Sequence, residues 1–353
     1  MSLSDYRRLS EEEVLQRIER AKADLGEDLV ILGHHYQRDE VIRFADHRGD
    51  SLELSRAAAN ARDARYIVFC GVDFMAESAA ILCDSTQRVF IPSKSARCPM
   101  AAMADVPDAT VAWEYLTSTW GDDLIPVTYQ NTSAALKAFC GEHGGAVCTS
   151  SNARAVFQWA LAQKGHILFF PDEHLGRNTA LSLGFLPREI AVWDPPQPGE
   201  VPTGLSESKV VVWKGFCHVH TFFTVEQVEL ARKRYPAATV IVHPECPAEV
   251  VGNSERNGST SLIVRAVEEA PAGAAFVIGT EMNLVSRLAK VHSDKTVVPL
   301  ARSFCDAMFR INPQNLLYSL EGIVEGRMDN VVEIPEEIAV GANQALGRML
   351  QVT

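Results

Sequence analysis

The sequence predicts an α/β protein made of three homologous three-layer α/β/α domains, with short parallel sheets arranged around a pseudo-threefold axis. Two observations support this fold class. Short apolar segments that end in polar residues alternate with amphipathic segments, the pattern of parallel strands covered by helices. The same four features also recur in the same order three times along the chain: a polar cluster, a helix start bearing a hydroxyl, an acidic turn and a cysteine.

The composition is that of a globular protein with room for several domains. The 353 residues are 47% hydrophobic and 22% charged. The net charge of −12, with no basic run, argues against a nucleic-acid partner but allows a small anionic substrate. The first ten residues lack the apolar core of a signal peptide, and no apolar stretch approaches the ~20 residues of a membrane helix. We therefore expect a cytoplasmic protein without a membrane partner.

A helix precedes the repeats. Ser10 and Glu13 have the spacing of a capping box, and Gly26 is a typical helix terminator. One face of the segment between them is apolar, at Val14, Ile18, Ala21 and Leu25.

Each repeat contains three predicted strands, and a functional feature follows each of them. The first has strand 29–32 with His34-His35-Tyr36-Gln37, Ser51 at a helix start, strand 66–69 with Asp73, and strand 89–91 with Cys98. The second has strand 124–127 with Tyr129-Gln130-Asn131, Thr149-Ser150-Ser151 at a helix start, strand 167–170 with Asp172, and strand 210–213 with Cys217. The third has strand 239–242 with His243-Pro244-Glu245, Ser259-Thr260 at a helix start, strand 276–278 with Glu281, and strand 296–298 with Cys305.

These features set the predicted domain limits. They are an N-terminal helix over 1–26, α/β repeats over 27–121, 122–222 and 223–312, and a C-terminal helical cover and tail over 313–353. The proline-rich segment 181–209 is interpreted as a surface excursion of the second repeat. Because parallel sheets place ligand groups beyond the carboxyl ends of their strands, the repeats point to one shared site.

One cysteine per repeat suggests a metal site made of Cys98, Cys217 and Cys305. Thiolates suit zinc, copper(I) or iron–sulfur clusters. A [4Fe–4S] cluster held by three thiolates would leave one iron open to act as a Lewis acid. The alternative is three buried cysteines at equivalent positions of a duplicated fold. The other cysteines are expected to be small buried hydrophobes rather than disulfides, and Cys246 is expected not to be a ligand because only one repeat has it.

Two further groups of residues point to substrate chemistry. Hydroxyls at helix starts can add donors to an anion site, although plain N-capping explains a single one equally well: Ser51, Ser150, Ser151, Ser259 and Thr260. Polar residues at strand ends or just past a cysteine are candidate general acids, bases or binding groups: His34, Tyr36, Tyr129, Asn131, His220, His243 and Glu245.

At these residues the sequence resembles the quinolinate synthase family. The matching motifs occur in order from about Val30 to Cys305: His34-His35-Tyr36, Gly49-Asp50-Ser51, Phe69–Glu77, Tyr129-Gln130-Asn131-Thr132-Ser133, Cys148–Asn152, Pro171-Asp172 with Leu175-Gly176, Trp213 with Gly215, Cys217 and His220, His243–Cys246, Gly258-Ser259-Thr260 and Gly279-Thr280-Glu281. The sequence departs from some relatives in having no second thiol near Cys305, so no redox disulfide is expected there.

The resemblance implies three related α/β/α domains around a [4Fe–4S] cluster on Cys98, Cys217 and Cys305. It implies condensation of iminoaspartate with dihydroxyacetone phosphate, with loss of phosphate and water, to give quinolinate for NAD biosynthesis. It also suggests functional coupling to an L-aspartate-oxidising enzyme. The implied catalytic residues are Tyr36, His220, His243 and Glu245. The implied substrate-binding residues are His34, Ser51, Tyr129, Asn131, Ser150 or Ser151, Ser259 and Thr260.

Two other functions fit part of this pattern. Another cluster-bearing dehydratase would share the open iron but would need only one substrate pocket. A non-catalytic iron–sulfur sensor or electron carrier would have a cluster ligated entirely by protein, and it gives no reason for the converging His, Tyr and Glu residues.

Overall fold

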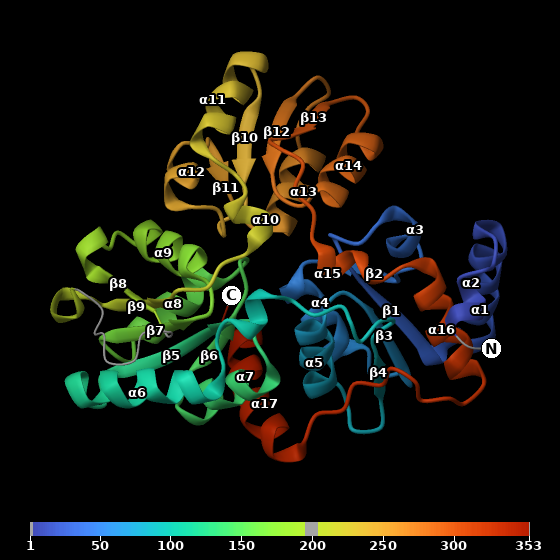
Figure 1. Ribbon diagram of the computed structural model, residues 1–353, viewed down its shortest axis with the longest axis horizontal. Coiled ribbons are helices and arrows are strands. Elements are labelled where there is room, and N and C mark those ends of the chain that lie inside the picture. The colour runs from blue at the N-terminus through green and yellow to red at the C-terminus, as the bar shows by residue number, and fades with distance from the viewer. Residues whose placement is uncertain (1–2, 195–203, 353) are drawn as a thin grey trace. The chain divides into compact units, whose positions relative to one another are not determined.

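The computed structural model describes residues 3–194 and 204–352. It contains three fully parallel sheets flanked by helices, which confirms the α/β fold class (Figure 1). No helix in these described ranges is both long and apolar enough to span a membrane.

Apart from one additional edge strand in the second, the three sheets share one strand order, in which the second strand of each repeat lies outside the first. The first sheet has the order β2 (His47–Gly49), β1 (Leu29–His34), β3 (Tyr66–Cys70), β4 (Arg88–Phe90). The second has β6 (Ala146–Cys148), β5 (Leu124–Tyr129), β7 (His166–Phe170), β9 (Val210–Trp213), β8 (Ile190–Trp193). The third has β11 (Arg256–Asn257), β10 (Thr239–Val242), β12 (Ala275–Gly279), β13 (Thr296–Pro299). This shared order is independent support for a threefold internal repeat.

The structure adds strands that periodicity did not indicate. β2 and β11 are edge strands of three and two residues, each followed by a helix that begins with a hydroxyl residue. β8 lies inside the segment interpreted as a surface excursion, and that interpretation was wrong for its first part. Ile190 pairs with Val210 and Trp193 with Trp213, so β8 is an additional edge strand of the second sheet. The prolines at 195–202 lie outside the described residues.

The chain divides into two compact units, one of residues 1–98 with 305–335 and one of residues 99–304 with 336–353. The first unit contains the first sheet and α1 (Leu3–Tyr6), α2 (Glu11–Leu25), α3 (Asp39–Ile42), α4 (Ser51–Asn60), α5 (Asp73–Leu82), α15 (Asp306–Phe309) and α16 (Pro313–Val324). The Ser10 hydroxyl accepts the Glu13 N–H at the start of α2, which confirms the N-cap half of the predicted capping box, and Gly26 ends the helix with φ of 53°.

The second unit contains the other two sheets. Its helices are α6 (Val106–Trp120), α7 (Ala134–Glu142), α8 (Ala153–Leu161), α9 (Glu173–Ser182), α10 (His218–Thr221), α11 (Val225–Arg234), α12 (Ala248–Gly252), α13 (Thr260–Glu268), α14 (Met282–Val291) and α17 (Glu336–Gln351). In Figure 1, α6 and α7 cover one side of the five-stranded sheet, and α8 and α9 cover the other. Short 3₁₀ turns occupy Gly26–Asp28, Met100–Ala102, Pro187–Glu189 and Leu205–Glu207.

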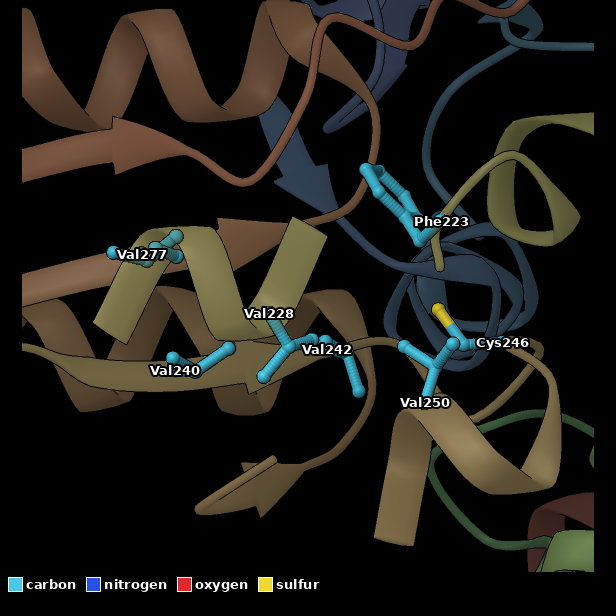
Figure 2. Close-up of a cluster of buried hydrophobic side chains, with 8 residues drawn as sticks. Phe223, Val228, Val240, Val242, Cys246, Val250 and Val277 are labelled. Carbon is cyan, nitrogen blue, oxygen red and sulfur yellow. The ribbon is translucent and has the colours of Figure 1, made fainter. Parts of the chain in front are cut away.

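The third sheet has a core of small branched side chains that also holds Cys246. Figure 2 shows the Cys246 sulfur next to Phe223 and Val250, at the end of β10. The Cys246 side chain is fully buried, and burial raises the pKa of its thiol well above the usual range. The thiol therefore packs as a small hydrophobe.

The last helix of the chain, α17, packs along α7 (Figure 1). Two glycines allow this close approach. A Cβ added to Gly141 of α7 would lie 1.9 Å from the carbonyl oxygen of Gly341 of α17. Arg348 closes the far end of the contact by donating to the carbonyl oxygens of Gly141, at 3.3 Å, and Gly145.

Candidate active site

The loops that carry the three candidate ligand cysteines, Cys98, Cys217 and Cys305, are fixed by equivalent hydrogen bonds. In each repeat, a backbone N–H of the acidic turn donates to the carbonyl oxygen two residues before the cysteine. The pairs are Asp73 to Ala96 at 2.9 Å, Glu173 to Gly215 at 2.8 Å and Met282 to Ser303 at 2.9 Å. This recurring bond places the acidic turn beside the cysteine loop in all three repeats.

The first of these loops has an additional side-chain contact. The Asp73 carboxylate accepts the backbone N–H of Cys98 at 3.2 Å and that of Phe74 at 2.9 Å. Asp73 therefore holds the cysteine itself as well as the residue two positions earlier. Sequence reasoning identified Asp73 only as part of an acidic turn and assigned it no role.

Exposure separates the candidate ligand cysteines from the four buried ones, Cys70, Cys140, Cys148 and Cys246; Cys83 is partly exposed, so the expectation that it is buried was wrong. All three candidate ligand cysteines are partly exposed, and Cys217 and Cys305 are the N-cap residues of the short helices α10 and α15. In contrast, burial raises the thiol pKa of Cys70 to about 12 and raises those of Cys140 and Cys148 above their usual value. A thiol with such a pKa is a poor source of the thiolate that a metal requires.

In the second unit, His220 lies at the centre of a buried polar network. Its Nδ1 is 2.6 Å from the Glu245 carboxylate, and its Nε2 is 3.1 Å from the Thr280 hydroxyl. His220 and Glu245 are only 1% and 2% exposed. Thr280 begins the acidic turn of the third repeat, and its contact with His220 was not predicted from the sequence.

His243 stacks on His220 with ring centroids 4.2 Å apart and an interplanar angle of 15°. Its Nδ1 accepts the Glu245 backbone N–H at 3.3 Å, so the neutral ring carries its proton on Nε2, which lies 3.2 Å from the Ser150 hydroxyl. Burial and the neighbouring His220 lower the pKa of His243 to about 3, against the opposing effect of Glu245. His243 is therefore a neutral hydrogen-bond donor at pH 7.

Two carboxyl groups in and beside this network have pKa values shifted in opposite directions. Burial alone would raise the pKa of Glu245, but His220, His243 and a hydrogen bond from the Tyr129 phenol outweigh it, and the pKa falls below its usual range. Asp172 is fully buried, and burial followed by the charge of Glu245 raises its pKa well above the usual value. Burial and the nearby Glu245 thus favour the protonated form of Asp172, whereas the neighbours of Glu245 favour its ionised form. Sequence reasoning assigned Asp172 no role.

Cys217, His220 and Glu245 also form a group of possible metal ligands, because their donor atoms lie within 4.8 Å of one another. Cys217 and His220 have Cys-x-x-His spacing, a signal that sequence reasoning overlooked. However, both ring nitrogens of His220 already have hydrogen-bond partners within the described residues. The His220–Glu245 pair is therefore better suited to holding and moving a proton next to the Cys217 sulfur than to ligating a metal.

The first unit has a related arrangement at the end of β1. The Nδ1 atom of His34 accepts the Tyr36 backbone N–H at 3.1 Å, as that of His243 accepts the Glu245 N–H. His34, at the end of β1, and His243, just past β10, occupy equivalent positions in their repeats. Both histidine rings are oriented by a backbone N–H two residues later that donates to Nδ1. Gln37, in the same loop, donates to the Met308 carbonyl oxygen at 3.4 Å and so contacts the helix that follows Cys305.

The predicted helix-start hydroxyls differ in their use. Asp50, not Ser51, caps α4, and Asn152 rather than Ser150 or Ser151 occupies the N-cap position of α8. Only Ser259 is itself a cap, since its hydroxyl accepts the Leu262 N–H at 3.3 Å. N-capping therefore does not explain the other hydroxyls.

Contacts join five of the predicted site residues in the second unit into one network: Tyr129, Ser150, His220, His243 and Glu245. Ser259 and Thr260 are buried at the start of α13, and Ser151 is exposed. The Asn131 Oδ1 is buried without a hydrogen-bond partner among the described residues.

Comparison with known proteins gives one consistent result. The model of the family described as quinolinate synthetase A protein matches residues 16–351. Among similar curated proteins is a quinolinate synthase from Corynebacterium glutamicum, 50% identical, with 99% of this chain and 90% of that protein covered. Quinolinate synthases from Anoxybacillus flavithermus and a Bacillus cereus strain are 48% and 47% identical, each with 98% of this chain and 95% of the relative covered. The chain belongs to the quinolinate synthase family of enzymes.

Proposed function

We propose that this enzyme condenses iminoaspartate with dihydroxyacetone phosphate and releases phosphate and water to form quinolinate in de novo NAD biosynthesis. The single observation that carries the proposal is the buried His220–Glu245 pair next to the Cys217 sulfur. A carboxylate hydrogen-bonded to an imidazole can transfer protons. The enolisation and the loss of water in this condensation both require proton transfer. An electron carrier has no use for such a pair.

The residues present fit a [4Fe–4S] cluster held by the three candidate ligand cysteines. Partly exposed thiols on loops fixed by equivalent hydrogen bonds supply three soft ligands, whereas Cys246 is packed in a core. A bound cluster with three thiolates supplies an open iron, a Lewis acid that assists loss of a hydroxyl group.

Proton transfer is assigned to the groups around Glu245. The ionised Glu245 carboxylate holds His220 through Nδ1 and stabilises positive charge on that ring, so the pair takes up a proton from substrate through the imidazole, while the Tyr129 phenol orients the carboxylate. Neutral His243 carries a proton on Nε2, next to the Ser150 hydroxyl, and this N–H orients a substrate oxygen. Tyr36, held next to His34 with ring centroids 4.7 Å apart, is the second candidate proton donor.

The hydroxyl residues are assigned to the anionic groups of the two substrates. Ser259 and Thr260 begin the nine-residue helix α13, whose first N–H groups and positive dipole end favour a phosphate. Ser51, Ser150 and Ser151 bind carboxylates, and Asn131 with His34 completes the substrate contacts. We further propose that the enzyme is cytoplasmic and is functionally coupled to an L-aspartate-oxidising enzyme, because iminoaspartate must come from such an oxidation.

A product assay tests the proposal. Protein purified without oxygen is given iminoaspartate and dihydroxyacetone phosphate, and quinolinate is measured by chromatography. Formation of quinolinate that requires both substrates supports the proposal. Dehydration of a hydroxy acid with no quinolinate would instead favour the rival dehydratase.

A further inference from the structure

The loop that carries Ser150 and Ser151 is held together by the side chain of Asn152. The Asn152 Oδ1 accepts the Thr149 backbone N–H at 2.8 Å and the Thr149 hydroxyl at 3.2 Å. The Thr149 hydroxyl oxygen in turn accepts the Ser151 N–H at 3.2 Å. Thr149 and Asn152 are 1% and 5% exposed, so the residues that support Ser150 and Ser151 are buried.

The other end of the same amide reaches the C-terminus of α17. The Asn152 Nδ2 donates to the carbonyl oxygens of Met349, at 3.1 Å, and Val352, at 3.0 Å. Carbonyl groups at the end of a helix lack intrahelical partners, so this amide satisfies two of them. The amide orientation is fixed, because a reversed amide would turn oxygen toward the carbonyl oxygens of α17 and nitrogen toward the Thr149 N–H.

Capping of α8 does not account for these bonds. Asn152 occupies the N-cap position of α8, yet its side chain makes no capping hydrogen bond to that helix. Among the described residues, the four hydrogen bonds of its side-chain amide go to Thr149 and to the C-terminal end of α17, at Met349 and Val352. The side chain therefore connects two segments about 200 residues apart.

The α17 end of this connection is firmly placed. α17 packs along α7 through the Gly141–Gly341 contact, and Arg348 donates to two carbonyl oxygens at the end of α7. At the other end, the Ser150 hydroxyl is 3.2 Å from His243, which stacks on His220. A displacement of the loop therefore changes the position of Ser150 relative to both histidines.

We infer that Asn152 is a positioning residue that ties the substrate-carboxylate loop Thr149–Ser151 to the C-terminal helix and thereby sets the affinity of the site for a dicarboxylate. This inference rests on the proposed function, in which Ser150 and Ser151 bind carboxylates. Asn152 does not touch substrate. It acts through the loop, and α17 serves as the fixed support.

The test compares two variants that weaken α17 in different places. Asn152→Ala removes the connection to the loop. Arg348→Ala removes a contact of α17 with α7 but leaves the loop intact, so it controls for lost stability. Binding of quinolinate, the product, is measured by calorimetry on cluster-loaded protein, together with the thermal midpoint and the iron content. Loss of the amide's buried bonds is expected to weaken quinolinate binding about tenfold in Asn152→Ala.

Arg348→Ala is expected to lower the thermal midpoint but to change the dissociation constant less than about twofold. Asn152→Asp, which keeps an acceptor for Thr149 but faces α17 with a carboxylate, is expected to match Asn152→Ala in binding. The inference is overturned if Asn152→Ala binds quinolinate as tightly as the wild type. It is also overturned if the loss of quinolinate affinity follows the fall in thermal midpoint equally in Asn152→Ala and Arg348→Ala. Should wild-type protein neither bind nor form quinolinate, the proposed function itself is wrong and the inference falls with it.

Discussion

Gly141→Ala places a methyl group where the backbones of α7 and α17 touch. The new Cβ would lie 1.9 Å from the Gly341 carbonyl oxygen and 3.3 Å from the Ala345 nitrogen. Because ordinary contact begins at 3.4 Å, α17 would have to retreat from α7 by about 1.5 Å. The clashing atoms are backbone, so no side-chain rotation relieves the overlap.

The magnitude follows from two opposing effects. Alanine improves helix propensity over glycine by about 1 kcal/mol, whereas overpacking costs about 1–3 kcal/mol and more where the backbone must move. We expect Gly141→Ala to lower the free energy of unfolding by about 3 kcal/mol. Displacement of α17 also pulls on Asn152, so weaker quinolinate binding should accompany the loss of stability.

Two glycines of the partner helix α17 provide matched controls. A Cβ at Gly341 would come within 3.0 Å of the Ala138 carbonyl oxygen, a milder overlap, and a Cβ at Gly347 would meet nothing within 4 Å. Urea unfolding of the three alanine variants should therefore rank Gly347→Ala at or above the wild type, Gly341→Ala below it and Gly141→Ala lowest. If Gly141→Ala were as stable as Gly347→Ala, the α7–α17 packing described here would be incorrect.

Three further predictions concern charge, loop support and thiol reactivity. Burial raises the pKa of Glu321, but its hydrogen bonds with Arg17, at 2.7 and 2.8 Å, outweigh burial and lower that pKa overall. Glu321→Gln should therefore lower the free energy of unfolding by about 2 kcal/mol at pH 7. In urea titrations this difference from the wild type should shrink as the pH falls below 4.5, because the wild-type carboxylate is then protonated. Asp73→Ala should reduce iron per chain because the Cys98 N–H loses its acceptor, and Asp73→Asn, which keeps an acceptor oxygen, should restore most of it; equal iron in all three proteins contradicts this role. Brief alkylation of folded, cluster-free protein should modify the three candidate ligand cysteines and leave Cys246 unmodified, as read by mass spectrometry. Rapid labelling of Cys246 would contradict its placement in the core.

The sequence predicted most of the repeated architecture because buried parallel strands leave a strong local signal. β9 and β10 begin and end at the predicted residues. β2 and β11 escaped prediction because two or three exposed edge residues carry no apolar pattern. β8 escaped because the prolines that follow it indicated an irregular segment, whereas pairing with β9 stabilises it.

The site was predicted unevenly for a similar reason. Residue type and position identified His220, His243 and Glu245, which the structure joins in one network. Asp172 and Asn152 were missed because their importance depends on burial and on partners distant in sequence, such as Glu245 and the end of α17. Local patterns contain no information about such partners.

The central claim is that three cysteines, one from each repeat, hold the cluster of an active quinolinate-forming enzyme. The most direct measurement is the iron and acid-labile sulfide content of anaerobically purified wild-type protein and of Cys217→Ala. We predict about four irons and four sulfides per wild-type chain, and loss of both with loss of quinolinate formation in the variant. Full iron content and full activity in Cys217→Ala would contradict the claim.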